Sequence, residues 1–264
     1  MATVTSRDGT KIGFEQVGTG PTLVLVDAAG GFRGFGPMGS LAQRLADRFT
    51  VVTYDRRGRG ESGDTLPYTV EREVEDLAAV ITAGGGAAFV HGFSSGAALA
   101  LLGASAGLPI SMLSLLEPPI ALDQSPQEGD LAAEIDELVA AGRRADAVEH
   151  FHKSIGVPPE MVAGMRQAPF FPMLEGIAHT LAYDARITPA VSHATLQSVT
   201  APALVVNSES SDDRLRGWAA GVAAALPQGR HLPLEGEWHG VSDDVLAPVL
   251  ADFFGGGARG ASPR

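Results

Sequence analysis

The pentapeptide Gly92-Phe93-Ser94-Ser95-Gly96 decides how the rest of this sequence is interpreted. It lies between an apolar run of strand length, residues 87–91, and a stretch of small residues of helical length, residues 96–106. A tight turn from strand to helix leaves little room beside its central residue, which explains the two glycines. The strained turn would present the Ser94 hydroxyl at the amino-terminal end of a helix, where negative charge is favoured. Ser94 is therefore the candidate nucleophile; the alternative is an ordinary glycine-containing turn.

Short apolar runs alternate with helical patterns along most of the chain. We predict strands over residues 22–26, 50–54, 87–91, 111–116, 203–206 and 230–234. We predict helices over residues 35–47, 70–83, 96–106, 214–226 and 241–254. Strands that are apolar on both sides are typical of parallel sheets covered by helices on both faces. The alternation predicts an α/β fold with a doubly wound, mostly parallel sheet, and a turn signal at residues 7–10 predicts an amino-terminal hairpin.

The alternation stops between residues 118 and 199, where every pattern is helical. The predicted helices there are residues 131–141, 146–155, 159–166 and 173–184. A helical insert between two strands predicts a lid above the carboxyl edge of the sheet. We expect a core made of residues 1–118 and 199–255, a lid of residues 119–198, and a flexible tail of residues 256–264.

Composition limits the function classes. Acidic residues exceed basic ones by 31 − 19 = 12, which disfavours binding to nucleic acid or an anionic membrane surface. The absence of cysteine excludes disulfides, a thiol nucleophile and cysteine-ligated metals. No phosphate loop, dinucleotide fingerprint or metal-ligand cluster appears, so we expect no cofactor and no metal. The start resembles no secretory signal, and glycine and proline interrupt the uncharged run 89–116, so we expect a cytoplasmic protein without a membrane span.

Two more motifs join the pentapeptide in a resemblance to the α/β-hydrolase superfamily over nearly the whole chain. Residues 55–62, Asp-Arg-Arg-Gly-Arg-Gly-Glu-Ser, are similar to its D-x-R-G-x-G-x-S loop. Residues 236–240, Gly-Glu-Trp-His-Gly, are similar to its G-x-x-H-x loop. The order and spacing of all three motifs match. The serine at position 94 separates the chain from epoxide hydrolases and haloalkane dehalogenases, which have aspartate there.

A serine hydroxyl is a poor nucleophile until a base takes its proton, and His239 is the best candidate for that base. It is one of seven histidines and lies in a glycine-flanked loop between the last predicted strand and the last predicted helix. The other six are more simply explained as structural or surface residues. Of these, His179 in the predicted lid could face a substrate.

The acidic member of the predicted triad has two candidate locations. In most superfamily members an aspartate follows the strand that is residues 203–206 here, and its usual position falls near Ser211. The neighbouring acids are out of register and could instead form a solvated loop and a helix cap: Glu209, Asp212 and Asp213.

Some superfamily members place the acid after the strand that leads out of the elbow helix. Here that residue is Glu117, followed by two prolines that would end the strand. A Ser–Glu–His set in this arrangement resembles the fungal lactonases that open the macrocycle of zearalenone. We predict Glu117 as the acid that orients His239 and keep the three acids near Ser211 as alternatives.

The resemblance also implies an oxyanion hole made by two backbone N–H groups. Ser95 would supply the first. The superfamily's His-Gly-x aligns with residues 27–29, Asp-Ala-Ala, so Ala29 would supply the second although the pattern departs there. In the predicted lid, aromatic residues could line an apolar substrate pocket or be plain core: Phe170, Phe171 and Tyr183.

Together these residues predict a cofactor-free serine hydrolase that cleaves a small apolar carboxylic ester or lactone through an acyl-enzyme. C–C bond hydrolysis, acyl transfer and perhydrolysis are alternatives with the same triad, because the pocket decides between them. The lost His-Gly also keeps open a hydrolase-like small-molecule binder without activity. Whether the chain forms a homodimer stays open.

Overall fold

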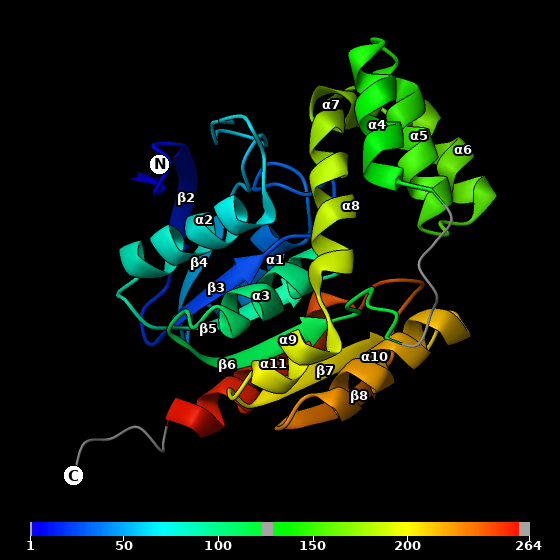
Figure 1. Cartoon of the computed structure of the whole chain (residues 1–264). Helices are drawn as coiled ribbons and strands as arrows, with labels where there is room; N and C mark the ends of the chain where they lie inside the picture. The colour runs from blue at the N-terminus through cyan, green and yellow to red at the C-terminus, as the bar shows by residue number, and fades with distance from the viewer. Residues whose placement is uncertain (1, 123–128, 259–264) are drawn as a thin grey trace.

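An eight-stranded sheet is the centre of the molecule in a computed structural model that describes residues 2–122 and 129–258. The strand order is β1-β2-β4-β3-β5-β6-β7-β8 (Figure 1). β1, β2 and β4 pair antiparallel, and every pair from β4 to β8 is parallel. The strands are β1 (Ala2–Thr5), β2 (Lys11–Val17), β3 (Thr22–Val26), β4 (Thr50–Tyr54), β5 (Ala88–Phe93), β6 (Ile110–Leu116), β7 (Ala203–Ser208) and β8 (Gly229–Leu234).

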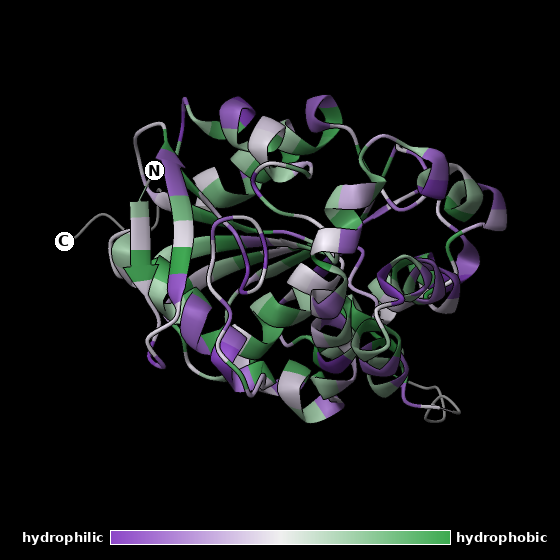
Figure 2. Cartoon of the chain, turned by 90° about the horizontal axis from the view of Figure 1, so that it is seen from above, coloured by the Kyte–Doolittle hydropathy of each residue, from purple (hydrophilic) through white to green (hydrophobic). Residues whose placement is uncertain are grey.

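Helices cover both faces of the sheet, because the inner strands are apolar on both sides. Every residue of β7 is buried, as are nearly all those of β3 and β5. On one face, α1 (Met38–Leu45) and α11 (Asp243–Ala258) pack against the strands. The other face carries α2 (Val70–Ala83), α3 (Ser95–Ser105) and α10 (Asp213–Ala225). Figure 2 shows the green strands between these two layers, with most purple residues on outlying helices and loops. The predicted doubly wound α/β sheet is confirmed.

The insert between β6 and β7 contains six α-helices in the part that the structure describes, and it extends beyond the carboxyl ends of the strands (Figure 1). They are α4 (Leu131–Ala140), α5 (Arg144–Ser154), α6 (Pro159–Gln167), α7 (Phe171–Gly176), α8 (Leu181–Ala190) and α9 (His193–Ser198). Helices α4, α5, α7 and the start of α8 share a hydrophobic cluster of their own. The end of the insert belongs to the main core, because Ile187, Val191 and Leu196 pack into the cluster on the sheet.

The predicted helix over residues 173–184 is wrong, because the chain breaks there into α7, a 3-10 turn (Ala178–Thr180) and α8. Arg144 of α5 explains the break. Its guanidinium donates to the carbonyl oxygens of Glu175 at 2.5 Å and Gly176 at 2.6 Å. These two carbonyls end α7, where an α-helix leaves its acceptors unused. A side chain from another helix thus satisfies them.

The predicted flexible tail is wrong for its first three residues, since α11 continues to Ala258. Glycine costs a helix about 1 kcal/mol but does not forbid it, and the fully buried Phe254 anchors the preceding turn. Residues 259–264 lie outside the described part of the chain. The uncharged run 89–116 forms β5, α3 and β6. Across residues 2–122 and 129–258, no helix has both the length and the apolarity needed to cross a bilayer.

Candidate active site

Ser94 lies on a tight turn between β5 and α3, with φ 52° and ψ −121°. A Cβ atom on Gly92 would lie 2.5 Å from the Gly96 carbonyl oxygen, and one on Gly96 would lie 2.3 Å from the Val26 carbonyl oxygen. Neither position can hold a larger residue without moving backbone. The Ser94 N–H donates to the Leu116 carbonyl oxygen at 2.9 Å, so the neighbouring strand β6 holds the turn in place.

His239, in the loop between β8 and α11, lies beside Ser94 although the two residues are 145 positions apart in the sequence. Its Nε2 lies 3.0 Å from Ser94 Oγ. Its Nδ1 lies 2.6 Å from Glu117 Oε2. A carboxylate only accepts hydrogen bonds, so Nδ1 carries the hydrogen and Nε2 of the neutral ring is left as an acceptor. The geometry therefore directs the Ser94 O–H toward His239 Nε2.

Glu117 directly follows β6, and its side chain has no solvent exposure. Its Oε1 accepts from the Ser208 N–H at 2.8 Å and from Ser211 Oγ at 2.6 Å. Ser211 Oγ in turn accepts from the His239 backbone N–H at 3.0 Å. Both carboxylate oxygens therefore accept hydrogen bonds. Ser211, in the loop after β7, contacts both Glu117 and His239 and so fixes their relative positions.

The same three residues share an unusual backbone conformation. In the described part of the chain, the non-glycine residues with positive φ are Ser94 at 52°, Glu117 at 46° and His239 at 54°. Such conformations cost on the order of 1–3 kcal/mol each and persist only where the surrounding structure imposes them. Backbone strain is thus concentrated on the three residues whose side chains form this hydrogen-bonded chain.

The three alternative acids have other roles in the structure. Asp212 Oδ1 accepts from the Leu215 N–H at 2.9 Å and so caps the start of α10. Asp213 pairs with Arg216 on the same helix. Glu209 is exposed. Among the hydrogen bonds of the described residues, Glu117 is the carboxylate that reaches the His239 ring.

The two predicted oxyanion donors lie at the carboxyl ends of adjacent strands. Ser95 opens α3, and Ala29 lies just after β3, which pairs with β5 in parallel so that Val26 lies beside Gly92. Within residues 2–122 and 129–258, neither the Ala29 nor the Ser95 backbone N–H donates to another group of the chain. Both are free to bind an oxygen of a ligand.

Asp27, which aligns with the histidine of the superfamily's His-Gly-x, is buried at the start of this loop. Its Oδ1 accepts from the Ala28 N–H at 2.8 Å. Its carboxyl group packs so closely on Gly31 and Gly36 that a Cβ on either would come within 2.5 Å of it. Burial raises the pKa of Asp27 from 3.8 to about 7, although Arg59 and Arg56 act to lower it. The two glycines thus make room for a carboxyl group that shapes the turn.

Two predicted pocket residues, Tyr183 and His179, face the loop after β4. The Tyr183 ring stacks on Tyr68 with centroids 3.8 Å apart, and its hydroxyl donates to Asp64 Oδ2 at 2.8 Å. His179 Nε2 lies 3.3 Å from the same carboxylate oxygen. These contacts join the insert to the core. His179 Nδ1 lies 3.2 Å from Arg144 Nη2, so the polar atoms of both side chains have partners within the chain.

The other two predicted pocket residues, Phe170 and Phe171, point to different places. Phe171 is buried in the cluster shared by the insert helices. The half-buried Phe170 packs on Phe35, with ring centroids 5.1 Å apart. Phe35 belongs to the loop that follows Ala29, so Phe170 is the predicted pocket residue that lies next to the oxyanion loop.

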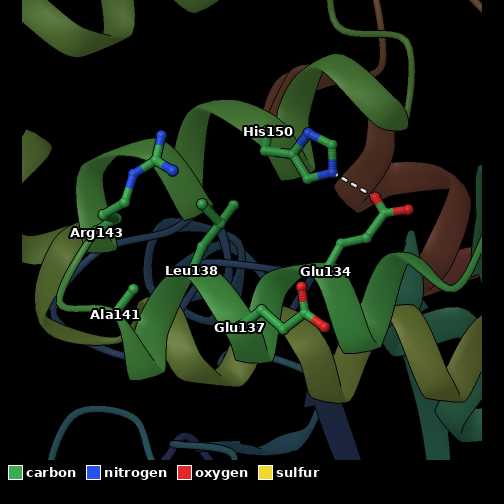
Figure 3. Close-up of a pocket in the computed structure, with 6 residues that line it drawn as sticks. All are labelled: Glu134, Glu137, Leu138, Ala141, Arg143 and His150. Carbon is green, nitrogen blue, oxygen red and sulfur yellow. Dashed lines mark hydrogen bonds and ion pairs between the residues drawn. The ribbon is translucent and has the colours of Figure 1, made fainter.

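An open surface pocket of about 480 Å³ lies between α4 and α5 (Figure 3). It is lined by Glu134, Glu137, Leu138, Ala141, Arg143 and His150. His150 Nε2 lies 2.6 Å from Glu134 Oε2 across it. It contains no member of the Ser94–His239–Glu117 set. The described residues also contain no group of three or more His, Asp or Glu side chains placed to hold a metal ion.

The chain resembles known proteins in sequence and in fold. The chain matches the model of the Alpha/beta hydrolase family over residues 23–249. The solved alpha/beta hydrolase from Sphaerobacter thermophilus DSM 20745 is 49% identical, with a TM-score of 0.90 over 96% of this chain and 100% of that one. The enol-lactonase from Burkholderia xenovorans LB400 shares the fold, at 21% identity and a TM-score of 0.72 over 96% of this chain and 100% of that one.

A curated relative matches over a shorter stretch. The uncharacterized hydrolase YraK of Bacillus subtilis (strain 168) is 38% identical over 99 residues, which are 35% of this chain and 35% of that protein. The match therefore spans little more than a third of that relative. The family match, in contrast, runs from β3 into α11 and includes residues 55–62, 92–96 and 236–240, which are the three motifs, as well as Glu117. The chain belongs to the alpha/beta hydrolase family.

Proposed function

We propose that this protein is a serine hydrolase that cleaves a carboxylic ester or lactone through an acyl-enzyme. In this proposal Ser94 is the nucleophile, His239 is the general base and Glu117 orients the imidazole. The observation that carries it is the continuous chain of short contacts, 3.0 Å from Ser94 Oγ to His239 Nε2 and 2.6 Å from His239 Nδ1 to Glu117 Oε2. This is the geometry that activates a serine hydroxyl.

The proposed reaction has two halves. Ser94 Oγ attacks the carbonyl carbon while His239 Nε2 takes its proton, and the carbonyl oxygen becomes an oxyanion. The N–H groups of Ala29 and Ser95 stabilise that oxyanion, and His239 then gives the proton to the leaving alkoxide oxygen. A water molecule, deprotonated by His239, attacks the acyl-enzyme in the same way and releases the acid. Glu117 stabilises the imidazolium that forms in each half.

The surroundings of the oxyanion loop favour a small apolar substrate. Leu174 of α7 lies against Gly30, since a Cβ added to Gly30 would be 3.3 Å from its Cδ2. The Phe35–Phe170 pair borders the same loop. Ser94 is only 8% exposed, which limits the size of a group that can approach its hydroxyl. Apolar side chains beside a few placed polar groups are typical of small-molecule sites.

Labelling with a fluorophosphonate probe, followed by mass spectrometry, tests the proposal together with an ester and lactone panel. We expect the wild type to be labelled at Ser94, and Ser94→Ala to lose labelling and several orders of magnitude of activity. Ser105→Ala is the matched control, because Ser105 lies on the same helix and contacts Ser198 on the far side from the site. Full activity in Ser94→Ala, or a wild type that takes no label, would show the proposal to be wrong.

A further inference from the structure

Two arginines of the loop after β4 are completely buried beside the candidate site. Arg56 and Arg59 have no exposed side-chain surface, and both bind the carboxylate of Asp184 on α8. Arg56 Nη1 lies 2.7 Å from Asp184 Oδ1, and Arg59 Nη2 lies 2.5 Å from Asp184 Oδ2. Arg56 also forms a two-pronged pair with Glu73. One carboxylate from the insert therefore joins two guanidinium groups of the core.

The superfamily-like motif in this loop does not account for these two residues. Its arginine is Arg57, which binds Asp76 of α2 instead, through Nε and Nη2 at 2.7 and 2.8 Å. Arg56 and Arg59 occupy the motif's variable positions. Burying two more cations needs a compensating charge, and Asp184 is exposed by only 2%. Burial acts to raise the pKa of Asp184, but Arg56 and Arg59 hold it below its ordinary value.

Arg59 binds the carbonyl side of the peptide whose N–H is one of the two proposed oxyanion donors. Its Nη1 donates to the Ala28 carbonyl oxygen at 2.7 Å and to the Gly31 carbonyl oxygen at 3.2 Å. The peptide between Ala28 and Ala29 is trans, so its C=O and N–H point in opposite directions. A cation on the Ala28 oxygen therefore turns the Ala29 N–H to the other side of the peptide plane. The same bond polarises the peptide and makes that N–H a stronger donor.

Asp184 also holds the second proposed donor. Ser95 Oγ donates to Asp184 Oδ1 at 2.7 Å. It accepts from Arg56 Nη1 at 3.3 Å. Ser95 is the residue whose backbone N–H points from the start of α3, so its side chain is fixed by the same carboxylate that fixes Arg59. Arg56 further reaches the Asp27 carbonyl oxygen at 3.4 Å, one peptide before Ala28.

We propose that Asp184 is a positioning residue that sets both oxyanion donors, the Ala29 N–H through Arg59 and the Ser95 N–H through the Ser95 side chain. The inference rests on the proposed hydrolase function and adds a structural requirement to it. An insert helix completes the oxyanion hole without touching the substrate. Loss of the Asp184 carboxylate loosens two donors at once, which affects the transition state more than the bound substrate.

Kinetics of Asp184→Asn test this, with kcat and KM measured on an ester that the wild type cleaves. We expect kcat to fall about 10- to 100-fold, which is no more than the loss that removal of one oxyanion donor causes. KM should change less than about threefold. Affinity for phenylboronic acid, which adds to a serine as a tetrahedral anion, should fall by a similar factor. Asp184→Glu, which keeps the charge, should recover part of the loss in kcat.

Asp76→Asn is the matched control, because it removes the carboxylate of the other buried Asp–Arg pair of the same loop. We expect it to lower the melting temperature as Asp184→Asn does, but to leave kcat and boronate affinity unchanged. Ser95→Ala covers the case in which Asp184→Asn does not fold. It keeps the backbone N–H and removes the side-chain contacts with Asp184 and Arg56. We expect a loss in kcat of about 3- to 10-fold, as for the loss of one short hydrogen bond.

Fluorophosphonate labelling separates the two proposals. A wild type without label at Ser94 overturns the proposed function and this inference with it. A labelled wild type together with an Asp184→Asn protein labelled at the same rate, with unchanged kcat and boronate affinity, overturns this inference alone. The same holds if Ser95→Ala is the variant that folds and it keeps the wild-type kcat.

Discussion

Ser211 Oγ donates a 2.6 Å hydrogen bond to Glu117 Oε1, so a serine of the loop after β7 supports a carboxylate that comes from β6. The usual acid location in the superfamily falls near Ser211. Here the carboxylate reaches the same place from the neighbouring strand, and Ser211 also accepts from the His239 backbone N–H at 3.0 Å. The position near Ser211 thus remains part of the site, as a hydrogen-bonding partner of the acid.

Glu117→Gln should nearly abolish activity. An amide can donate to His239 Nδ1 and thereby favour the wrong tautomer, and the corresponding amide change in a serine protease costs ~10⁴ in kcat. We expect a loss of at least about 10³-fold in kcat with folding intact, measured by steady-state kinetics and circular dichroism. Asp212→Asn is the control and should stay active. An active Glu117→Gln with an inactive Asp212→Asn would transfer the acid role to Asp212.

Moving the acid back to the β7 loop should restore part of the activity. Glu117→Ala removes the carboxylate, and adding Ser211→Asp to it places a new one beside His239, where Ser211 Oγ now lies. Because the acid acts only by orienting and stabilising the imidazole, its strand of origin is unimportant. We expect the double variant to have a higher kcat than Glu117→Ala alone. Equal rates for the two would mean that the β7 position cannot reach Nδ1.

Asp27 should make the free energy of unfolding depend on pH. Its pKa is about 7 in the folded protein, against an ordinary 3.8, so the folded state binds the extra proton between pH 4 and 7. The contribution of Asp27 to stability therefore falls as pH rises through that window, by at most ~1.4 kcal/mol per pH unit, and is constant above it. Buried His91, whose pKa burial lowers to about 3, contributes the opposite slope up to about pH 6.5. Asp27→Asn should therefore make the slope of stability against pH more positive than in the wild type, as measured by urea unfolding at pH 5, 6, 7 and 8.

Asp8→Asn is the control for that experiment. Burial acts to raise the pKa of Asp8, but hydrogen bonds from Thr10 and the contact with Arg57 lower it to about 2. Asp8 is therefore ionised in both states across pH 5 to 8, and its substitution should not change the slope. The same slope in the wild type and in Asp27→Asn would show that Asp27 does not titrate in this window.

Gly96→Ala should destabilise the fold, whereas Gly217→Ala should stabilise it. A Cβ on Gly96 would lie 2.3 Å from the Val26 carbonyl oxygen, and backbone must move to admit it, at a cost of about 1–3 kcal/mol. Gly217 lies inside α10 with nothing within 4 Å of an added Cβ, so alanine there should add about 0.5–1 kcal/mol. Urea denaturation of both variants checks the two signs, and a neutral Gly96→Ala would mean that the turn can relax.

Local patterns were enough to predict most of the fold, since a strand or helix depends on the periodicity of nearby residues. The predicted strands coincide with or lie close to β3 through β8, and the hairpin forms as expected. The insert was less predictable. The break before α8 depends on Arg144, a residue on a different helix from the carbonyls that it satisfies. No periodicity within residues 173–184 contains that information.

The candidate site likewise contains some residues that the sequence was enough to predict and others that it was not. Ser94 and His239 stand in short motifs whose glycines are required by local backbone geometry, so the sequence alone was enough to predict both as candidates. Whether Glu117 or an acid near Ser211 contacts His239 depended on the relative positions of the loops that follow β6 and β7. The link from Asp184 to Arg56 and Arg59 crosses more than a hundred residues of chain. Only the tertiary structure decided it, because a buried charge pairs with an opposite charge that lies close to it in space, whatever their separation along the chain.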